Sequence, residues 1–129
     1  MPARIRRRMR LRALRGAITV AENEAGAILA ATDELVREVM ERNTLGAEDI
    51  VSCIFTCTED LDAEFPAVAA RRIGLSAVPL LCAREIDVPG ALPRVIRLLV
   101  HCYADPQTPA HHVYLREAMS LRKDLEGAQ

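Results

Sequence analysis

The sequence predicts an α/β fold in which two helices pack on one face of a single mixed sheet. Two kinds of segment lead to this fold class: some repeat apolar residues at helical spacing, and others are short, apolar and β-rich. They follow one another in the order β-α-β-α-β-β-β, which is not the strict alternation of a parallel α/β fold. The 129 residues, half of them hydrophobic, suffice for one domain with an aliphatic core.

The first half of the chain is predicted to be strand, helix and strand. Residues 10–20 indicate a strand, in which Gly16 permits another backbone to approach closely. Asn23 is a suitable N-cap for a helix whose apolar spacing continues to about Arg42. The apolar run IVSCIFTCT, residues 50–58, then predicts a buried strand.

The second half is predicted to contain one short helix and three strands. Pro66 begins the helix in its first turn, and Gly74 ends it. The breaker-rich stretch 87–93 predicts a loop. Short apolar runs predict the three strands at residues 78–83, 95–103 and 112–115. The run 95–103 would also suit a helix.

Charge is unevenly distributed, although the net charge is only −1. The first fifteen residues contain seven arginines and no acid. We expect residues 1–9 to be a disordered basic leader, with Met9 an alternative start, 10–125 to be the domain and 126–129 a tail. The leader lacks interleaved aromatic residues, and no apolar run approaches the ~20 residues of a membrane span, so we expect no nucleic-acid or membrane partner.

The four cysteines form no CxxC pair and no disulfide-rich spacing, which is typical of a reduced, cytoplasmic protein. Cys53 and Cys57 lie four apart in an apolar run and are interpreted as core thiols. Cys82 stands near a strand end, three residues before Glu85, where functional side chains often lie. Cys82 could act as a nucleophile or as a hydrogen-bonding thiol, but no sequence feature supplies the base that a nucleophile would need.

No pattern in the sequence indicates a metal or a cofactor. Two pairs of possible ligands, His101-Cys102 and His111-His112, are adjacent residues, and adjacent side chains of a strand point to opposite faces. The sequence also contains no G-x-G-x-x-G and no P-loop motif. We therefore expect neither a metal nor a nucleotide cofactor.

Two arginines, Arg15 and Arg97, interrupt predicted strands. Arginine within a buried strand rarely lacks a partner. For Arg97 that partner is either an internal carboxylate, Glu85 or Asp87, or a ligand, and the pattern leaves both open. Two such arginines favour bidentate recognition of carboxylates on a small organic dianion.

Four segments of the chain resemble the small, trimeric, monofunctional chorismate mutases. They occur in the family's order and spacing, and the resemblance runs from about residue 9 to residue 125. The segments are RALRGAITV (12–20), TEDLDAEFPAVAAR (58–71), VPLLCAREIDVPGALPRVIRL (78–98) and HVYLREAMSLRKDL (112–125). One departure is Val68, at a position that is often lysine in relatives.

The resemblance implies an isomerase that rearranges chorismate to prephenate for Phe and Tyr biosynthesis, without a cofactor or covalent intermediate. It implies an α+β, ferredoxin-like or pseudo-barrel fold that assembles as a homotrimer with sites at subunit interfaces. Three catalytic roles follow from it. Arg15 binds a substrate carboxylate, Arg97 faces the ether oxygen of the breaking C–O bond, and Glu85 accepts a hydrogen bond from the ring hydroxyl.

The resemblance also implies further substrate contacts. Tyr114 reaches the side-chain carboxylate, and Cys82 makes a polar contact. Three further groups of residues complete the set. The main chain of Leu81, Ala83 and Arg84 lines the pocket beside Cys82. A neighbouring subunit's loop and helix contribute Phe65, Ala67 and Arg71, and a C-terminal segment covers the site with Leu121 and Arg122.

Two alternatives are weighed against this interpretation. One is an enamine/imine deaminase on a similar trimeric scaffold, which also holds a carboxylate with arginine at a subunit interface. The other is a non-catalytic trimer that senses a metabolite of the aromatic pathway. The full order of motifs from Arg15 to Arg122 disfavours the first, and the presence of both Arg97 and Glu85 disfavours the second.

Overall fold

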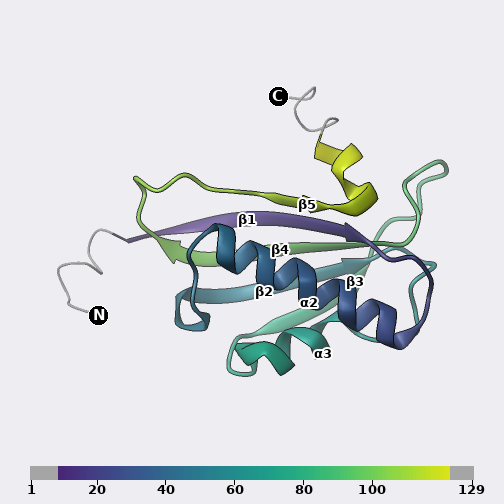
Figure 1. Cartoon of the computed structure of the whole chain (residues 1–129), viewed down its shortest axis with the longest axis horizontal. Helices are drawn as coiled ribbons and strands as arrows, with labels where there is room; N and C mark the ends of the chain where they lie inside the picture. Colours follow the sequence, from purple (N-terminus) through teal and green to yellow (C-terminus); the bar gives the residue numbers. More distant parts are fainter. Residues whose placement is uncertain (1–8, 123–129) are drawn as a thin grey trace.

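The computed structural model describes residues 9–122 and contains one mixed sheet with the strand order β3-β2-β4-β1-β5 (Figure 1). The central strand β4 is antiparallel to both of its neighbours, whereas the outer pairs β2–β3 and β1–β5 are parallel. Four strands therefore run in one direction around a fifth that runs in the other. The strands are β1 (Arg10–Thr19), β2 (Ile50–Cys57), β3 (Leu80–Arg84), β4 (Val95–Ala104) and β5 (Val113–Leu115).

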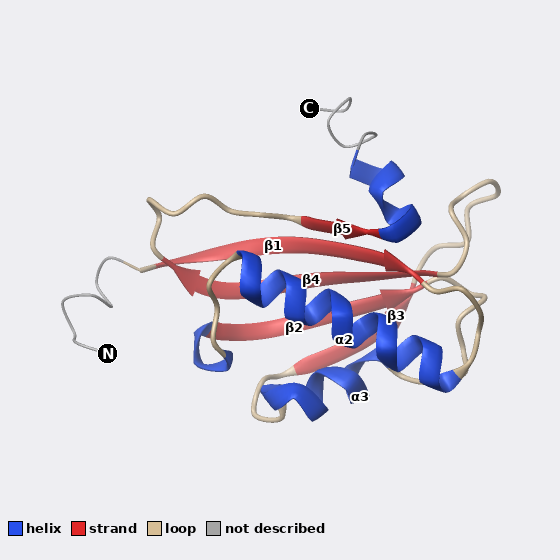
Figure 2. Ribbon diagram, viewed as in Figure 1, coloured by secondary structure: helices blue, strands red, loops and turns tan. Residues whose placement is uncertain are grey.

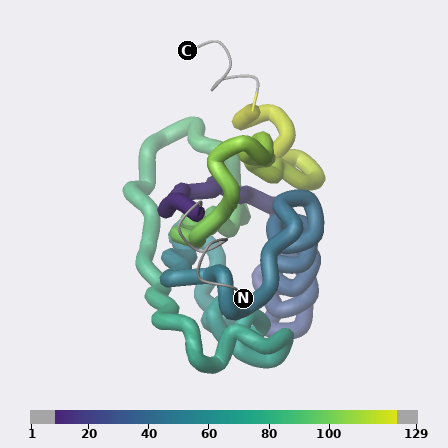
Figure 3. The backbone as a smooth tube through the Cα atoms, turned by 90° about the vertical axis from the view of Figure 1, so that its left-hand side faces the viewer, coloured from purple at the N-terminus to yellow at the C-terminus, as the bar shows by residue number. Residues whose placement is uncertain are grey.

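Two helices pack on the same face of this sheet, as predicted (Figure 2). The long helix α2 (Ala25–Arg42) crosses the middle of the sheet, and α3 (Pro66–Ala70) lies beside it. Turned by 90°, the molecule shows α2 stacked along one side of the strands (Figure 3). Helix α3 continues into a wider turn to Leu75, where Gly74 adopts φ +111°. Gly74 thus ends the helix as expected, since glycine adopts positive φ at little cost.

The start of α2 corrects one prediction. Glu24, not Asn23, is the N-cap, and its carboxylate accepts the backbone N–H groups of Gly26 and Ala27 at 2.9 and 2.8 Å. These two hydrogen bonds lower the pKa of Glu24. The side chain of Asn23 instead bridges to the loop before α3, where it donates to the Asp62 carboxylate at 2.7 Å.

Gly16 lies where α2 packs tightly on β1. A Cβ atom added there would lie 3.1 Å from Leu35 Cδ1 and 3.2 Å from Val39 Cγ2. The close approach predicted at Gly16 therefore exists: helix side chains make its tightest contacts, and the backbone carbonyl oxygen of Val113 on β5 lies 3.5 Å from the same point. Those leucine and valine side chains are fully buried and belong to the main core between sheet and helices.

The strands carry different side chains on their two faces, because successive residues of a strand point in opposite directions. On the helix-covered face the large side chains are apolar and at most 3% exposed: Leu14, Ile18, Phe55, Ile96 and Leu98. The opposite face, called the open face below, carries Arg15, Thr56 and Arg97. Among residues 9–122, one end of the open face is covered, where Ala118 packs on Ala17 and Val95.

Other predictions have mixed outcomes. The run 95–103, which also suited a helix, is the central strand β4. The observed order β-α-β-α-β-β-β differs from the β-α-β-β-α-β order of ferredoxin-like folds, so that part of the expectation is wrong. The expected leader 1–9, apart from Met9, and the tail 126–129 lie outside the described residues. No helix in 9–122 is long and apolar enough to cross a membrane.

Candidate active site

Arg97 of β4 and Glu85, in the loop after β3, form an ion pair on the open face. Arg97 Nε donates to both Glu85 carboxylate oxygens, at 2.9 Å to Oε1 and 3.1 Å to Oε2. Within residues 9–122, Arg97 donates hydrogen bonds through Nε alone. The internal-carboxylate interpretation of Arg97 is thus confirmed for Glu85, yet the two terminal nitrogens donate to no residue in 9–122, and the side chain remains 43% exposed. The two interpretations are therefore compatible.

The register of the sheet places Arg97 in a row of side chains that all point to the open face. Arg97 lies opposite Ala17 of β1 on one side and opposite Thr56 of β2 on the other. The row ends at Ala83 on β3 and at Tyr114 on β5. Small neighbours on β1 and β2 leave room around the guanidinium, and Tyr114 packs over Ala17.

Arg15 lies on the same open face, two residues along β1 from the position opposite Arg97. Diagonal neighbours of this kind are roughly 7–8 Å apart, within reach of one small ligand. The Arg15 guanidinium makes no hydrogen bond or ion pair with any residue in the described part of the chain. Its backbone N–H donates to His112 Nδ1 at 3.0 Å, which fixes the approach to β5.

The loop 86–93 forms a cavity of about 520 Å³ beside the ion pair. Glu85 and Arg97 line this cavity together with the loop itself and residues 58–60. The rim is tied at Asp60, whose carboxylate accepts the backbone N–H of Arg94 at 3.0 and 3.1 Å and the Thr58 hydroxyl at 2.6 Å. We call this space the Arg97 cavity.

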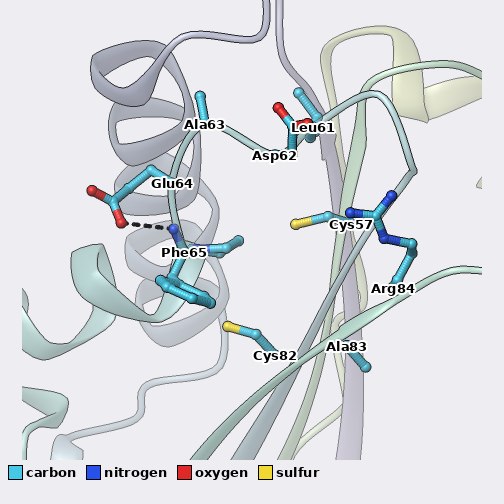
Figure 4. Close-up of a pocket in the computed structure, with 10 residues that line it drawn as sticks. Cys57, Leu61, Asp62, Ala63, Glu64, Phe65, Cys82, Ala83 and Arg84 are labelled. Atoms are coloured by element: carbon cyan, nitrogen blue, oxygen red, sulfur yellow. Dashed lines mark hydrogen bonds between the residues drawn. The ribbon is translucent and has the colours of Figure 1, made fainter.

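Cys82 lines a second cavity, of about 320 Å³, on the helix side of β3 (Figure 4). There the Cys82 and Cys57 sulfur atoms point into the same space beside the Phe65 ring. Burial raises the pKa of Cys57 to about 11, so its thiol stays protonated near neutral pH. Leu61 and Arg84 also line this space, which we call the Cys82 cavity.

The structure therefore divides the predicted site residues into two groups. Arg15, Glu85, Arg97 and Tyr114 share the open face, whereas Cys82 lies with Phe65 on the other side of β3. Glu85 and Cys82 are three residues apart, and an odd spacing on an extended chain sends side chains to opposite faces. This spacing was the signal in the sequence that separates them.

The remaining predicted residues lie at the edges of these two groups. Leu81 and Ala83 are exposed on β3, Ala67 is buried in α3, and Arg71 is exposed just after it. Leu121 packs on the covered end of the open face with Ala118, and Arg122 is exposed next to it. Among residues 9–122 no group of three or more possible ligands could hold a metal ion.

Sequence reasoning missed Thr56. Its hydroxyl donates to Glu85 Oε2 at 2.9 Å, from the strand position directly opposite Arg97. No local pattern marks this threonine, because its neighbour on β4, Arg97, is 41 residues further along the chain, and the sequence does not reveal that pairing.

Comparisons with known proteins point to one family. The family model described as chorismate mutase type I matches residues 11–125. The chain is 54% identical to the chorismate mutase AroH of Thermus thermophilus over 121 residues, which cover 92% of this chain and 99% of that one. It is 40% identical to the chorismate mutase AroH of Bacillus subtilis over 119 residues, covering 91% and 94% of the two chains.

A solved structure is similar as well. A chorismate mutase from Clostridium thermocellum superimposes with a TM-score of 0.80 at 46% sequence identity. The match covers 84% of this chain and 98% of that one. At this identity the likeness extends from the fold to the family.

Proposed function

The chain belongs to the type I chorismate mutase family, and from this premise we propose that the Arg97–Glu85 pair carries the rearrangement of chorismate to prephenate. The observation that supports this most is that Arg97 contacts Glu85 through Nε alone. An arginine engaged in this way keeps its outer N–H groups for a ligand, while the carboxylate fixes the plane of the guanidinium. The pair is thus already oriented before substrate arrives.

The rearrangement needs oriented charge and a folded substrate, rather than a nucleophile or a transferred proton. As the C–O bond breaks, the ether oxygen gains negative charge and the ring becomes relatively positive. The outer N–H groups of Arg97 stabilise the first change, and the Glu85 carboxylate complements the second. Because both charges develop only in the transition state, these contacts accelerate the chemical step instead of merely tightening binding.

Arg15 and Tyr114 hold the two carboxylates of the dianion in this proposal. The Arg15 guanidinium is uncommitted within the described residues and lies diagonally across from Arg97. Tyr114 stands at the β5 end of the row that contains Arg97. With one carboxylate at each, the flexible side chain of the substrate is folded over its ring, which reduces the entropy lost on reaching the transition state.

Magnitudes indicate how the work is shared. A rate gain of ~10⁶ requires about 8 kcal/mol. One preorganised donor contributes roughly 3–4 kcal/mol, so Arg97 alone is insufficient. Restriction of the substrate by Arg15 and Tyr114 accounts for much of the remainder, since orientation is worth up to roughly 7–11 kcal/mol.

We also propose a homotrimer, arranged as a pseudo-barrel of sheets, with its active sites at subunit interfaces. Large apolar side chains are exposed on the open face, with Leu11, Leu81 and Tyr103 at 58%, 60% and 51%. Such exposure on one sheet face is typical of a surface that meets another protein. The Arg97 cavity, moreover, is open to solvent, and within residues 9–122 it is lined by two loops and the strand that carries Arg97.

In this assembly a neighbouring subunit brings Phe65, Ala67 and Arg71 to the Arg97 cavity. Cys82 then comes with them, because it shares its cavity with Phe65 and lies on the far side of β3 from Glu85. The main chain of residues 81–84 and the C-terminal Leu121 and Arg122 complete the enclosure. A solution molar mass of three chains supports this proposal, and a monomeric mass with full activity contradicts it.

The test of the reaction is direct. Purified protein is incubated with chorismate alone, without metal or cofactor, while loss of the diene absorbance and formation of prephenate are followed. We expect turnover under these conditions. Binding of chorismate without turnover would instead support the metabolite sensor, and release of ammonia from an enamine substrate would support the deaminase. The free cysteines also favour the cytoplasm as the place where this reaction occurs.

A further inference from the structure

Within residues 9–122 the Glu85 carboxylate accepts three hydrogen bonds, and two of them come from Arg97. The third comes from the Thr56 hydroxyl, 2.9 Å from Oε2. Oε2 thus receives Thr56 and the longer Arg97 contact at 3.1 Å, whereas Oε1 receives only the shorter one at 2.9 Å. A carboxylate oxygen has two lone-pair directions, so Oε2 is saturated and Oε1 keeps one direction for a further donor.

We infer that Thr56 is a positioning residue that selects Glu85 Oε1 as the acceptor for the substrate. This inference rests on the proposed function, in which Glu85 accepts the ring hydroxyl. Thr56 does not touch the substrate itself: it occupies the other oxygen and thereby fixes the rotation of the carboxylate about its last side-chain bond.

The position of Thr56 suits this role. It stands directly opposite Arg97 on β2, on the same open face and partly buried. A β-branched side chain on a strand has a restricted χ1, so the position of the Thr56 hydroxyl oxygen is set by the backbone. Glu85, by contrast, is a longer side chain in a loop, although its backbone N–H is held by the Cys57 carbonyl at 2.9 Å. The stiff residue therefore orients the flexible one.

Removal of the hydroxyl has a consequence for Arg97 as well. Arginine and carboxylate prefer a bidentate fork in which two guanidinium nitrogens each donate to one oxygen. In the observed geometry a single nitrogen, Nε, serves both oxygens. Without Thr56 holding Oε2, Glu85 is free to rotate into the fork and to occupy an outer nitrogen of Arg97. The Arg97–Glu85 ion pair would then use an N–H group of Arg97 that the substrate needs.

The experiment compares Thr56→Val, which keeps the shape, with Thr56→Ser, which keeps the hydroxyl. Loss of a hydrogen bond to a charged group predicts that Thr56→Val lowers kcat about ten- to a hundredfold. Thr56→Ser is expected to recover activity to within about threefold of the parent, because serine supplies the same donor. Ser52→Ala, which removes a hydroxyl from the same strand that bonds His101 at 3.2 Å, is the matched control and is expected to leave kcat unchanged.

A second arm separates positioning from simple structural support. In a Glu85→Gln background, Thr56→Val is expected to change kcat less than about twofold, because residues that act as one unit are not additive. An equal loss in both backgrounds would overturn the inference, as would a Thr56→Ser variant as impaired as Thr56→Val. The melting temperature of each variant is measured alongside, and we expect Thr56→Val to lose kcat without a matching loss of stability.

Arg97→Lys, measured in the same series, distinguishes the two levels of failure. If Arg97→Lys loses activity while Thr56→Val keeps it, the inference about Thr56 fails and the proposed function stands. If Arg97→Lys keeps normal turnover, the proposed function fails, and the role of Thr56 fails with it.

Discussion

The two faces of the sheet are built from the same strands, but one face forms the hydrophobic core and the other carries the candidate active site. On the helix-covered face, alternate residues of β1, β2 and β4 are large, apolar and almost fully buried. On the open face, the residues between them include Arg15, Thr56 and Arg97, and the ion pair there is 43% and 18% exposed on its two sides. Neighbouring residues of one strand therefore contribute to different properties: one packs in the core and stabilises the fold, and the next lies at the candidate active site. Substitutions on the two faces should fail in different assays.

The largest effect is expected on the helix-covered face. Phe55 is fully buried, so Phe55→Ala removes most of a large side chain and leaves a cavity. We expect a loss of about 3–5 kcal/mol in the free energy of unfolding, measured by urea denaturation. The fraction that remains folded should turn over chorismate at nearly the parent rate. A folded Phe55→Ala protein with a hundredfold lower kcat would break the comparison between the faces.

A smaller free-energy change, read in a different assay, is expected on the open face. Arg97→Lys keeps a positive charge but replaces a planar fork with a flexible point charge. We expect kcat to fall by about 10²–10³-fold, with a melting temperature close to that of the parent. Arg37→Lys is the matched control, since Arg37 forms an exposed ion pair with Asp33 on α2, and it should leave kcat and melting temperature unchanged. Near-normal turnover of Arg97→Lys would contradict the role assigned to this arginine.

The smallest effect is expected at the edge of the sheet beside Arg15. His112 Nδ1 accepts the Arg15 backbone N–H, which requires a neutral ring, and burial together with the Arg15 charge lowers the pKa of His112. Because the unfolded chain binds this proton more readily, stability is present above the ordinary histidine pKa near 6.5 and declines as the pH falls toward the lowered value. The urea midpoint should therefore drop between about pH 7 and pH 5.

A matched pair of variants tests that drop. His112→Gln should flatten part of the pH dependence. His111→Gln should not, because His111 contacts Asn43 through its backbone N–H and carbonyl. Identical pH profiles for the two variants would mean that the His112 ring contributes nothing to stability.

The elements themselves could be predicted from the sequence because their signals are local. The apolar runs marked β1, β2 and β5 and the helical spacing marked α2 to within a residue or two. Asn23 is predicted as the N-cap because asparagine is a common cap, but Glu24 takes that place, since its longer side chain reaches two backbone N–H groups. The apolar run of β4 suits a strand in the sequence and would also suit a helix. Its alternation of buried and partly exposed residues becomes visible only in the sheet, where β1 and β2 pair with it.

The site was harder to predict because it depends on pairing between distant strands. Arg15 and Arg97 could be singled out as charges in apolar runs, and the family resemblance supplied their roles. That both lie on one face, with Glu85 engaged by a single nitrogen, follows from the β1–β4 register and from the side-chain geometry. The separation of Cys82 from Glu85 could have been predicted from the sequence, since a spacing of three residues on an extended chain sends their side chains to opposite faces.

The central place of β4 also governs how the chain can fold. β1 and β2 are both paired to β4: the β1–β4 ladder joins residues as distant as Arg10 and Ala104, and the β2–β4 ladder joins Ile50 to Cys102. On the ribosome, β1 and β2 are made long before the strand that joins them. Until β4 inserts, each exposes an apolar edge on which another nascent chain can pair. The strand that carries Arg97 thus also covers these two edges and joins β1 to β2, and folding of this enzyme should be slow for its size.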